Sequence, residues 1–158
     1  MTLSHLDADG RARMVDVGDK PETARRAAAS GTITMAPAAF ATLRDEGGPK
    51  GDVLGTAELA GVMAAKRTAD LIPLCHALLL EQVDVHATLD AGLPGVRVEA
   101  RVRSVGRTGV EMEALTAVTV ALLTVYDMVK ATGHELRIGD IVLLEKSGGR
   151  SGDWRRSP

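Results

Sequence analysis

Residues 109–129, GVEMEALTAVTVALLTVYDMV, form the most apolar stretch of this 158-residue sequence, and the fold depends on how this stretch is packed. It is long enough to cross a membrane, but it carries Glu111, Glu113 and Asp127, which are costly in bilayer hydrocarbon. We therefore expect a helix over about 110–131 that is buried inside a globular domain. Because this helix is apolar on most of its circumference, we expect it to pack against a second subunit as well as its own sheet.

Segments with strand periodicity flank this helix on both sides. Before it, residues 81–90 and 95–105 alternate apolar and polar side chains, and DAGLPG at 90–95 is a suitable turn between them. An antiparallel hairpin is therefore expected. After the helix, which Gly133 should stop, LRIGDIVLLEKS at 136–147 predicts a final strand.

The N-terminal part of the chain adds two strands and two helices. A short strand is expected over 12–17 and a longer one over 23–35, although the Ala-rich first half of 23–35 would also suit a helix. Pro37 predicts the start of a short helix that two adjacent glycines end. Asp52 is a suitable cap for a second helix, which we expect to run to Pro73.

The order of these elements predicts the fold class. Strand, helix, strand, strand, helix, strand, with additions, suits a ferredoxin-like α+β sandwich, in which two main helices cover one face of an antiparallel sheet. The length and a hydrophobic content of 45% are those of one domain over residues 1–158. The Gly-, Ser- and Arg-rich tail from about 147 is expected to be flexible.

Composition and charge argue against several classes of protein. A formal charge of −2 and a pI near 6.1 give no general attraction for polyanions, and one Phe, one Tyr and one Trp are too few for nucleic-acid stacking. Neither a nucleic-acid partner nor a membrane is therefore expected. The single cysteine excludes an internal disulfide, and the opening MTLSHLDADG lacks the features of a secretory signal, which favours the cytoplasm.

Two glycine-rich loops are candidate anion sites. In GGPKGD at 47–52, Lys50 precedes a helix start, so its ammonium and the free backbone N–H groups could together hold a phosphate. In EKSGGRSGD at 145–153, Lys146 and Arg150 flank paired glycines in the same way. Neither loop matches the GxxxxGK[ST] pattern, and a flexible loop with solvated cations is the alternative reading of both.

His76 is the candidate for acid–base chemistry among the four histidines. It lies in LCH at 74–76, just after Pro73, where a side chain can project from a rigid scaffold into a cleft. A structural histidine is the alternative. The histidines are scattered and Cys75 has no second cysteine, so no metal site is expected, and Cys75 is interpreted as a small buried apolar residue.

Charged residues lie at both ends of the long helix. Glu111 and Glu113, at its start, complement the helix dipole but point to different faces, so at least one is directed toward protein or a cleft. Near the other end, Asp127 and Lys130 share a face and can pair or jointly contact a substrate, with a surface ion pair as the alternative.

The length of the helix separates these two ends. Seventeen residues from Glu113 to Lys130 correspond to roughly 25 Å along the axis. One small pocket in a single chain cannot contain both residues. If both ends are functional, the chain has two sites, or one site is shared between two subunits, which is the simpler arrangement.

Several long motifs together carry a family resemblance. MVDV, KGDV, AKRTADLIPLCH, TGVEMEAL, YDMVKA and KSGGRSGD resemble the molybdenum cofactor biosynthesis protein C family, the cyclic pyranopterin monophosphate synthases. The resemblance covers nearly the whole chain. It departs at Ala69, where a tryptophan is common, at Ala77, where a proline often follows LCH, and at Arg150, which replaces a lysine.

The resemblance implies a lyase that converts 3′,8-cyclo-7,8-dihydroguanosine 5′-triphosphate into cyclic pyranopterin monophosphate and releases pyrophosphate. Its catalytic residues would be His76, Glu111, Glu113, Asp127 and Lys130, with Lys130 as a general acid. Its substrate-binding residues would be Lys50, Leu74, Cys75, His76, Met112, Glu113 and Lys146, with Arg25 and Arg150 as further cations for the triphosphate.

The resemblance also implies a ferredoxin-like homohexamer, a trimer of dimers, with each active site at a dimer interface. No cofactor is required by the sequence, although Mg²⁺ could accompany the triphosphate. Two other readings remain at this point: a non-catalytic oligomer that binds a nucleotide or pterin, and a structural hexamer. The carboxylates argue against a pure triphosphate binder, because like charges repel.

Overall fold

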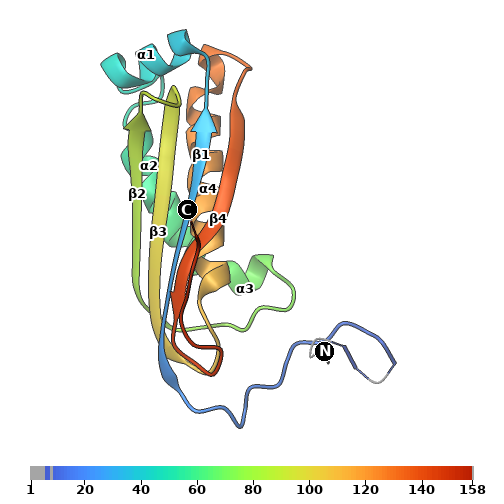
Figure 1. Cartoon of the computed structure of the whole chain (residues 1–158). Coiled ribbons are helices and arrows are strands. Elements are labelled where there is room, and N and C mark those ends of the chain that lie inside the picture. The colour runs from blue at the N-terminus through green and yellow to red at the C-terminus, as the bar shows by residue number, and fades with distance from the viewer. Residues whose placement is uncertain (1–5, 8, 158) are drawn as a thin grey trace.

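A five-stranded antiparallel sheet, with strands in the order β2-β3-β1-β4-β5, forms one layer of the protein, and its main helices form the other (Figure 1). The structure is a computed structural model that describes residues 6–7 and 9–157. Its elements in chain order are β1 (Thr23–Thr34), α1 (Pro37–Glu46), α2 (Val53–Ala65), α3 (Thr68–Leu71), β2 (Leu80–Asp90), β3 (Gly95–Gly106), α4 (Glu111–Val129), the 3₁₀ helix η1 (Lys130–Thr132), β4 (Arg137–Ser147) and β5 (Trp154–Arg155).

The core lies between the sheet and helices α2 and α4. Ile33 of β1, Val98 of β3 and Leu122 of α4 are fully buried in this core. The helix approaches the sheet closely because β1 has a glycine there: a Cβ on Gly31 would lie 2.8 Å from a Leu122 methyl group. The predicted α+β class with an antiparallel sheet is confirmed, and so are the hairpin, the strand over 23–35 and the final strand.

Helix α4 has the length and composition of a membrane span but is a core helix here. An 18-residue window within Glu111–Thr132 has a mean hydropathy of 1.5. One side of it, including Val118 and Val125, is completely buried against the sheet and α2, whereas Leu123 on the opposite side is 53% exposed. The prediction of a buried helix is confirmed, and Leu123 leaves some apolar surface exposed.

The strand predicted over 12–17 is wrong. The structure has only an isolated bridge between Leu6 and Ala12 there, and the segment runs away from the sheet (Figure 1). Aspartate side chains explain the difference, because they bond the backbone locally: Asp7 Oδ1 accepts the Arg11 N–H at 2.8 Å, and Asp16 Oδ1 accepts the Gly18 N–H at 2.8 Å. Such turns compete with strand pairing.

The helix predicted to run from Asp52 to Pro73 is in fact two helices. Asp52 caps α2 as expected, accepting the Gly55 N–H at 2.9 Å. The helix ends at Ala65, because the buried Thr68 hydroxyl donates to the Ala65 carbonyl at 3.0 Å, and a short α3 follows. This break directs the chain toward the loop that carries residues 74–76.

The tail after β4 turns back onto the sheet. Trp154 and Arg155 form β5, which pairs with Lys146 and Glu145 of β4. The glycines at 148, 149 and 152 have positive φ, which lets the chain reverse within a few residues. The loop 148–152 is thereby held beside the beginning of β1.

Candidate active site

The predicted site residues fall into two groups at opposite ends of α4. One group, here called the Asp127 cluster, consists of Lys50, Asp127 and Lys130. The other surrounds the start of α4 and lines two adjoining hollows, the His76 pocket and the Lys146 pocket. The structure therefore brings together the members of each group and keeps the groups apart within one chain.

The Asp127 cluster joins the end of α4 to the loop before α2. Lys130 Nζ lies 2.7 Å from Asp127 Oδ1, and Lys50 Nζ lies 3.0 Å from Asp127 Oδ2 and 3.1 Å from the Asp127 carbonyl oxygen. The predicted pairing of Asp127 with Lys130 is confirmed. The contact with Lys50 is additional, and it depends on a loop whose glycines at 47, 48 and 51 all have positive φ.

The charges of this cluster reinforce one another. Hydrogen bonds from Lys130 and then Lys50 lower the pKa of Asp127, and Asp127 raises the pKa of Lys130. All three side chains are about half exposed, so the ion pairs contribute little to stability. Two ammonium groups around one carboxylate leave an excess positive charge at the surface, which suits contact with an anion.

The His76 pocket is a hollow of about 310 Å³ between the 74–76 loop, the start of α4 and the N-terminal segment. Its walls are Val15, Val17, Lys20, Leu74, Cys75, His76, Leu78, Thr108, Gly109, Glu111, Met112 and Glu113. All the predicted residues of the LCH motif and of the helix start line it. The Pro73 turn and the first turn of α4 thus position these side chains around one space.

The tautomer of His76 follows from its hydrogen bond. His76 Nε2 lies 2.7 Å from the Val15 carbonyl oxygen. A carbonyl only accepts, so Nε2 carries a proton and donates it. In the neutral ring Nδ1 then has the lone pair and can accept a proton from a ligand.

Glu113 is the buried carboxyl group of the His76 pocket, at 4% exposure. Burial raises its pKa, nearby Glu111 adds to this effect, and the backbone N–H of Glu113 opposes it. Burial and then Glu113 raise the pKa of the Cys75 thiol. Glu113 is therefore suited to proton transfer, and Cys75 is half-buried and stays protonated rather than acting as a nucleophile.

The Lys146 pocket, of about 480 Å³, adjoins the His76 pocket. Lys146 Nζ lies 3.3 Å from Glu111 Oε1 and donates to Ser151 Oγ at 2.9 Å. Six cationic side chains line it, against the single carboxylate of Glu111: Lys20, Arg25, Arg26, Arg107, Lys146 and Arg150. The pocket therefore favours a ligand with several negative charges.

Arg25 holds the wall of the Lys146 pocket in place. Its Nε donates to the Gly106 carbonyl and its Nη1 to the Gly148 carbonyl, each at 3.4 Å. Gly148, at φ 91°, leaves no room for a Cβ against the Ala24 carbonyl. Arg25 thus fixes the loop after β4 as well as contributing charge.

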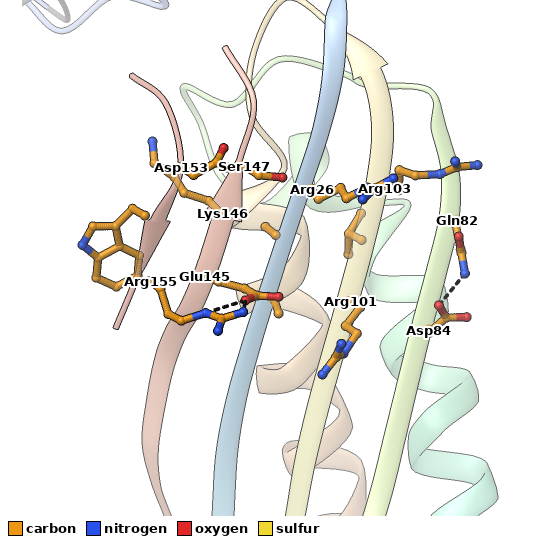
Figure 2. A pocket seen from close by; sticks show the side chains of 14 residues that line it. Arg26, Gln82, Asp84, Arg101, Arg103, Glu145, Lys146, Ser147, Asp153 and Arg155 are labelled. Atoms are coloured by element: carbon orange, nitrogen blue, oxygen red, sulfur yellow. Dashed lines mark hydrogen bonds and ion pairs between the residues drawn. The ribbon is translucent and has the colours of Figure 1, made fainter. Parts of the chain in front are cut away.

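A wider hollow, of about 660 Å³, lies on the face of the sheet away from the helices (Figure 2). Two polar contacts join side chains that line it: Arg155 Nη2 lies 2.7 Å from Glu145 Oε2, and Gln82 donates to Asp84 at 2.7 Å. Of the predicted site residues, only Lys146 lines it. The histidine and the buried carboxyl group line the smaller His76 pocket instead.

Sequence patterns did not mark every residue of these pockets. Val15 belongs to the segment for which a strand was expected, and Lys20 follows that segment, yet both line the His76 pocket. The available signal for Val15 was the MVDV motif at 14–17, one of the motifs that carry the family resemblance, and no motif marked Lys20. Among the residues that the structure describes, no group of three or more His, Cys, Asp or Glu is arranged to hold a metal ion.

Comparison with known proteins gives one consistent result. The sequence model of the MoaC family matches residues 14–149. A protein named cyclic pyranopterin monophosphate synthase from Methylobacterium sp. (strain 4-46) is 62% identical over 157 residues, which cover 99% of this chain and 98% of the relative. Proteins of the same name from Methylobacterium nodulans and Brucella ovis are 60% identical over 157 residues and 57% identical over 152 residues, covering 98% and 92% of those relatives and 99% and 96% of this chain.

Proposed function

This chain belongs to the MoaC family, and from that premise we infer that it is a cyclic pyranopterin monophosphate synthase of molybdenum cofactor biosynthesis. The observation that carries this conclusion is the near-complete coverage, at 57–62% identity, of relatives with that name. The proposed substrate is 3′,8-cyclo-7,8-dihydroguanosine 5′-triphosphate, and the second product is pyrophosphate. The enzyme would therefore be a phosphorus–oxygen lyase.

The proposed roles of the pockets follow from their charges. The six cations of the Lys146 pocket suit a triphosphate, and the adjoining His76 pocket suits the ring system. In the phosphate step a substrate hydroxyl attacks the α-phosphorus, its proton passes to a base, and the bond between the α-phosphorus and the bridging oxygen breaks. The departing pyrophosphate takes up negative charge, which the cations stabilise.

The ring rearrangement needs groups that accept and donate protons. His76 offers its Nδ1 as an acceptor, because Nε2 is occupied by the Val15 carbonyl. Glu113, whose pKa is raised by burial, can hold a proton closer to neutral pH than an exposed glutamate. Lys130 is charged beside Asp127 and is proposed as a general acid.

We propose that each complete site is built from two subunits. The Asp127 cluster and the His76 pocket lie at opposite ends of α4, a single helix over Glu111–Val129. If the α4 helices of two copies lay antiparallel side by side, each cluster would meet the partner's His76 pocket. The exposed Leu59, Met63 and Leu123 provide apolar surface on α2 and α4 for such a contact.

The finer features of fold and setting complete the proposal. The order β2-β3-β1-β4, with crossover helices on one face, supports a ferredoxin-like sandwich. The assembly proposed from the family is a homohexamer, a trimer of dimers, in the cytoplasm. Mg²⁺ is proposed to accompany the triphosphate rather than to bind a dedicated protein site.

Turnover of the cyclised dihydro-GTP intermediate tests the function. The purified protein is incubated with the intermediate, and pyrophosphate and a cyclic-phosphate pterin are measured, with Lys130→Ala as the inactive control. Both products should appear with the wild type and be greatly reduced with the variant. If the ligand binds but neither product forms, the protein is a non-catalytic binder and the enzyme proposal is wrong.

A further inference from the structure

We propose that Lys20 is a further substrate-binding residue, which contacts the phosphate group nearest to the substrate's ring system. This rests on the proposed function. Four residues line both the His76 pocket and the Lys146 pocket, and Lys20 is the only cation among them. The other three are Thr108, Gly109 and Glu111.

The junction of the two pockets is where that phosphate would lie. A substrate with its ring system beside His76 and its terminal phosphates beside Lys146 must pass its α-phosphate between the two pockets. Glu111, at this junction, would repel the phosphate, and Lys146 is already paired with Glu111 at 3.3 Å. A second cation is therefore needed at this position, and Lys20 supplies it.

Lys20 is held at the junction by its own segment, residues 15–21, here called the strap. The Val15 carbonyl is bonded to His76 at one end. Further along, the Lys20 N–H donates to the Val17 carbonyl at 3.0 Å, and Asp16 Oδ1 accepts the Gly18 N–H at 2.8 Å. These turns place a half-buried lysine over the pocket before any ligand arrives, which limits the entropic cost of binding.

The Lys20 ammonium is also available to a ligand. The ion pairs formed by the described residues use Lys50 and Lys130 on Asp127 and Lys146 on Glu111, and none of them includes Lys20. Lys20 also lines a small hollow with Arg150, so the strap and the loop after β4 meet there. Charge neutralisation at the α-phosphate would help both binding and departure of pyrophosphate.

The test compares full-length Lys20→Met and Lys20→Arg with wild type and with Arg97→Met. Arg97 is a suitable control because it is an exposed cation of β3, paired with Asp90 and absent from both pockets. Lys20→Met should lower kcat/KM for the intermediate and weaken inhibition by GTP, a purine nucleotide that has an α-phosphate, each about 10- to 100-fold, the range expected for one charged hydrogen bond. Lys20→Arg should retain most of the wild-type kcat/KM and most of the inhibition. Tm should be unchanged in all variants.

Two results overturn the inference. The first is a Lys20→Met protein whose kcat/KM and GTP inhibition lie within about twofold of wild type, a change too small for a lost charged contact. The second is an equal loss in Lys20→Arg accompanied by a lowered Tm, which indicates a structural role. If the wild type shows no turnover, the proposed function fails, and calorimetric titration with GTP still decides on Lys20. Equal binding in wild type and Lys20→Met, or no binding in either, rejects the inference.

Discussion

Asp127 is a carboxylate whose two oxygens face two different lysines. Lys130 comes from the same helix end, and Lys50 from a loop 77 positions earlier in the chain. An exposed pair alone would be of little consequence for stability, but this arrangement fixes the direction of both ammonium groups. The carboxylate therefore serves to position two cations toward whatever approaches the end of α4.

Asp127→Asn tests this role. The amide keeps the shape but loses the charge that holds Lys50 and Lys130, so turnover should fall about 10²- to 10⁴-fold, as for loss of a proton-transfer group. Tm should hardly change, because the side chains are exposed. Asp45→Asn is the matched control, since Asp45 is an exposed carboxylate paired with Arg44 on α1. Equal activity of the two variants would contradict the assignment.

Glu113→Gln tests the burial of the carboxyl group in the His76 pocket. The pKa of Glu113 is raised by folding, so the folded protein holds the proton more tightly, and stability is lost as pH rises from the ordinary glutamate range through the raised pKa. The variant should therefore be more stable than wild type at pH 7, and the difference should vanish at about pH 4. Urea unfolding from pH 4 to 8 measures this, with exposed Glu46→Gln as control. A difference independent of pH would contradict the burial effect.

The site residues could be predicted from the sequence where the chemistry is local. Asp127 and Lys130 are three residues apart on a helix, so their contact followed from spacing. The contacts of Lys50 with Asp127 and of Val15 with His76 could not be predicted from spacing, because they join residues 77 and 61 positions apart. Such contacts depend on the packing of loops, which no periodic pattern records.

At the scale of elements, close packing of α4 on β1 fixes the position of both groups of site residues. Gly31 lies where Leu122, Val118 and Ile141 converge, and a Cβ there would lie 2.8–3.0 Å from all three. The helix can approach only because this position has no side chain. A small change in β1 would thus displace α4 and everything at its ends.

Gly31→Ala should destabilise the protein by about 1–3 kcal/mol, the usual effect of overpacking a core. Gly139→Ala is the matched control, because a Cβ on Gly139 of β4 meets nothing within 4 Å. Urea unfolding of both variants measures the difference in free energy of unfolding. If both variants lost the same stability, the contact between α4 and β1 would not be the cause.

The elements that were predicted correctly have strong periodicity or clear end signals. The alternation in β2 and β3 and the Asp52 cap of α2 both led to the observed elements. The strand over 12–17 was wrong because aspartate side chains took the backbone N–H groups. The break after Ala65 was missed because it involves a hydrogen bond from the buried Thr68 hydroxyl to the Ala65 carbonyl. The sequence does not reveal that Thr68 is buried.

At the scale of the whole molecule, α4 separates the His76 pocket from the Asp127 cluster and leaves Leu123 exposed between them. Both facts are explained if two copies pack through this surface. On the proposal of a shared site, a monomer would contain every proposed site residue and still lack a complete site. Activity should therefore depend on protein concentration wherever dimers dissociate.

Mixing two inactive variants tests the shared site. Glu113→Ala damages the His76 pocket and Lys130→Ala damages the Asp127 cluster, so each homo-oligomer should be inactive. After dissociation and joint reassembly, a mixed dimer contains one undamaged site, and about a quarter of wild-type activity should return if subunits mix at random. Two preparations of Lys130→Ala with different tags are the control for mixing. Inactive oligomers that demonstrably contain both variants would contradict a shared site.

Cys75 gives the chain a built-in reporter. It is the only cysteine in the sequence, it is half-buried in the His76 pocket, and its thiol has a raised pKa beside Glu113. Thiol reagents react with the thiolate, so labelling should be slow and should yield one product. Because a bound ring system would cover the sulfur, a ligand in the His76 pocket should slow the labelling. The labelling rate therefore measures pocket occupancy without an introduced cysteine or an engineered tag.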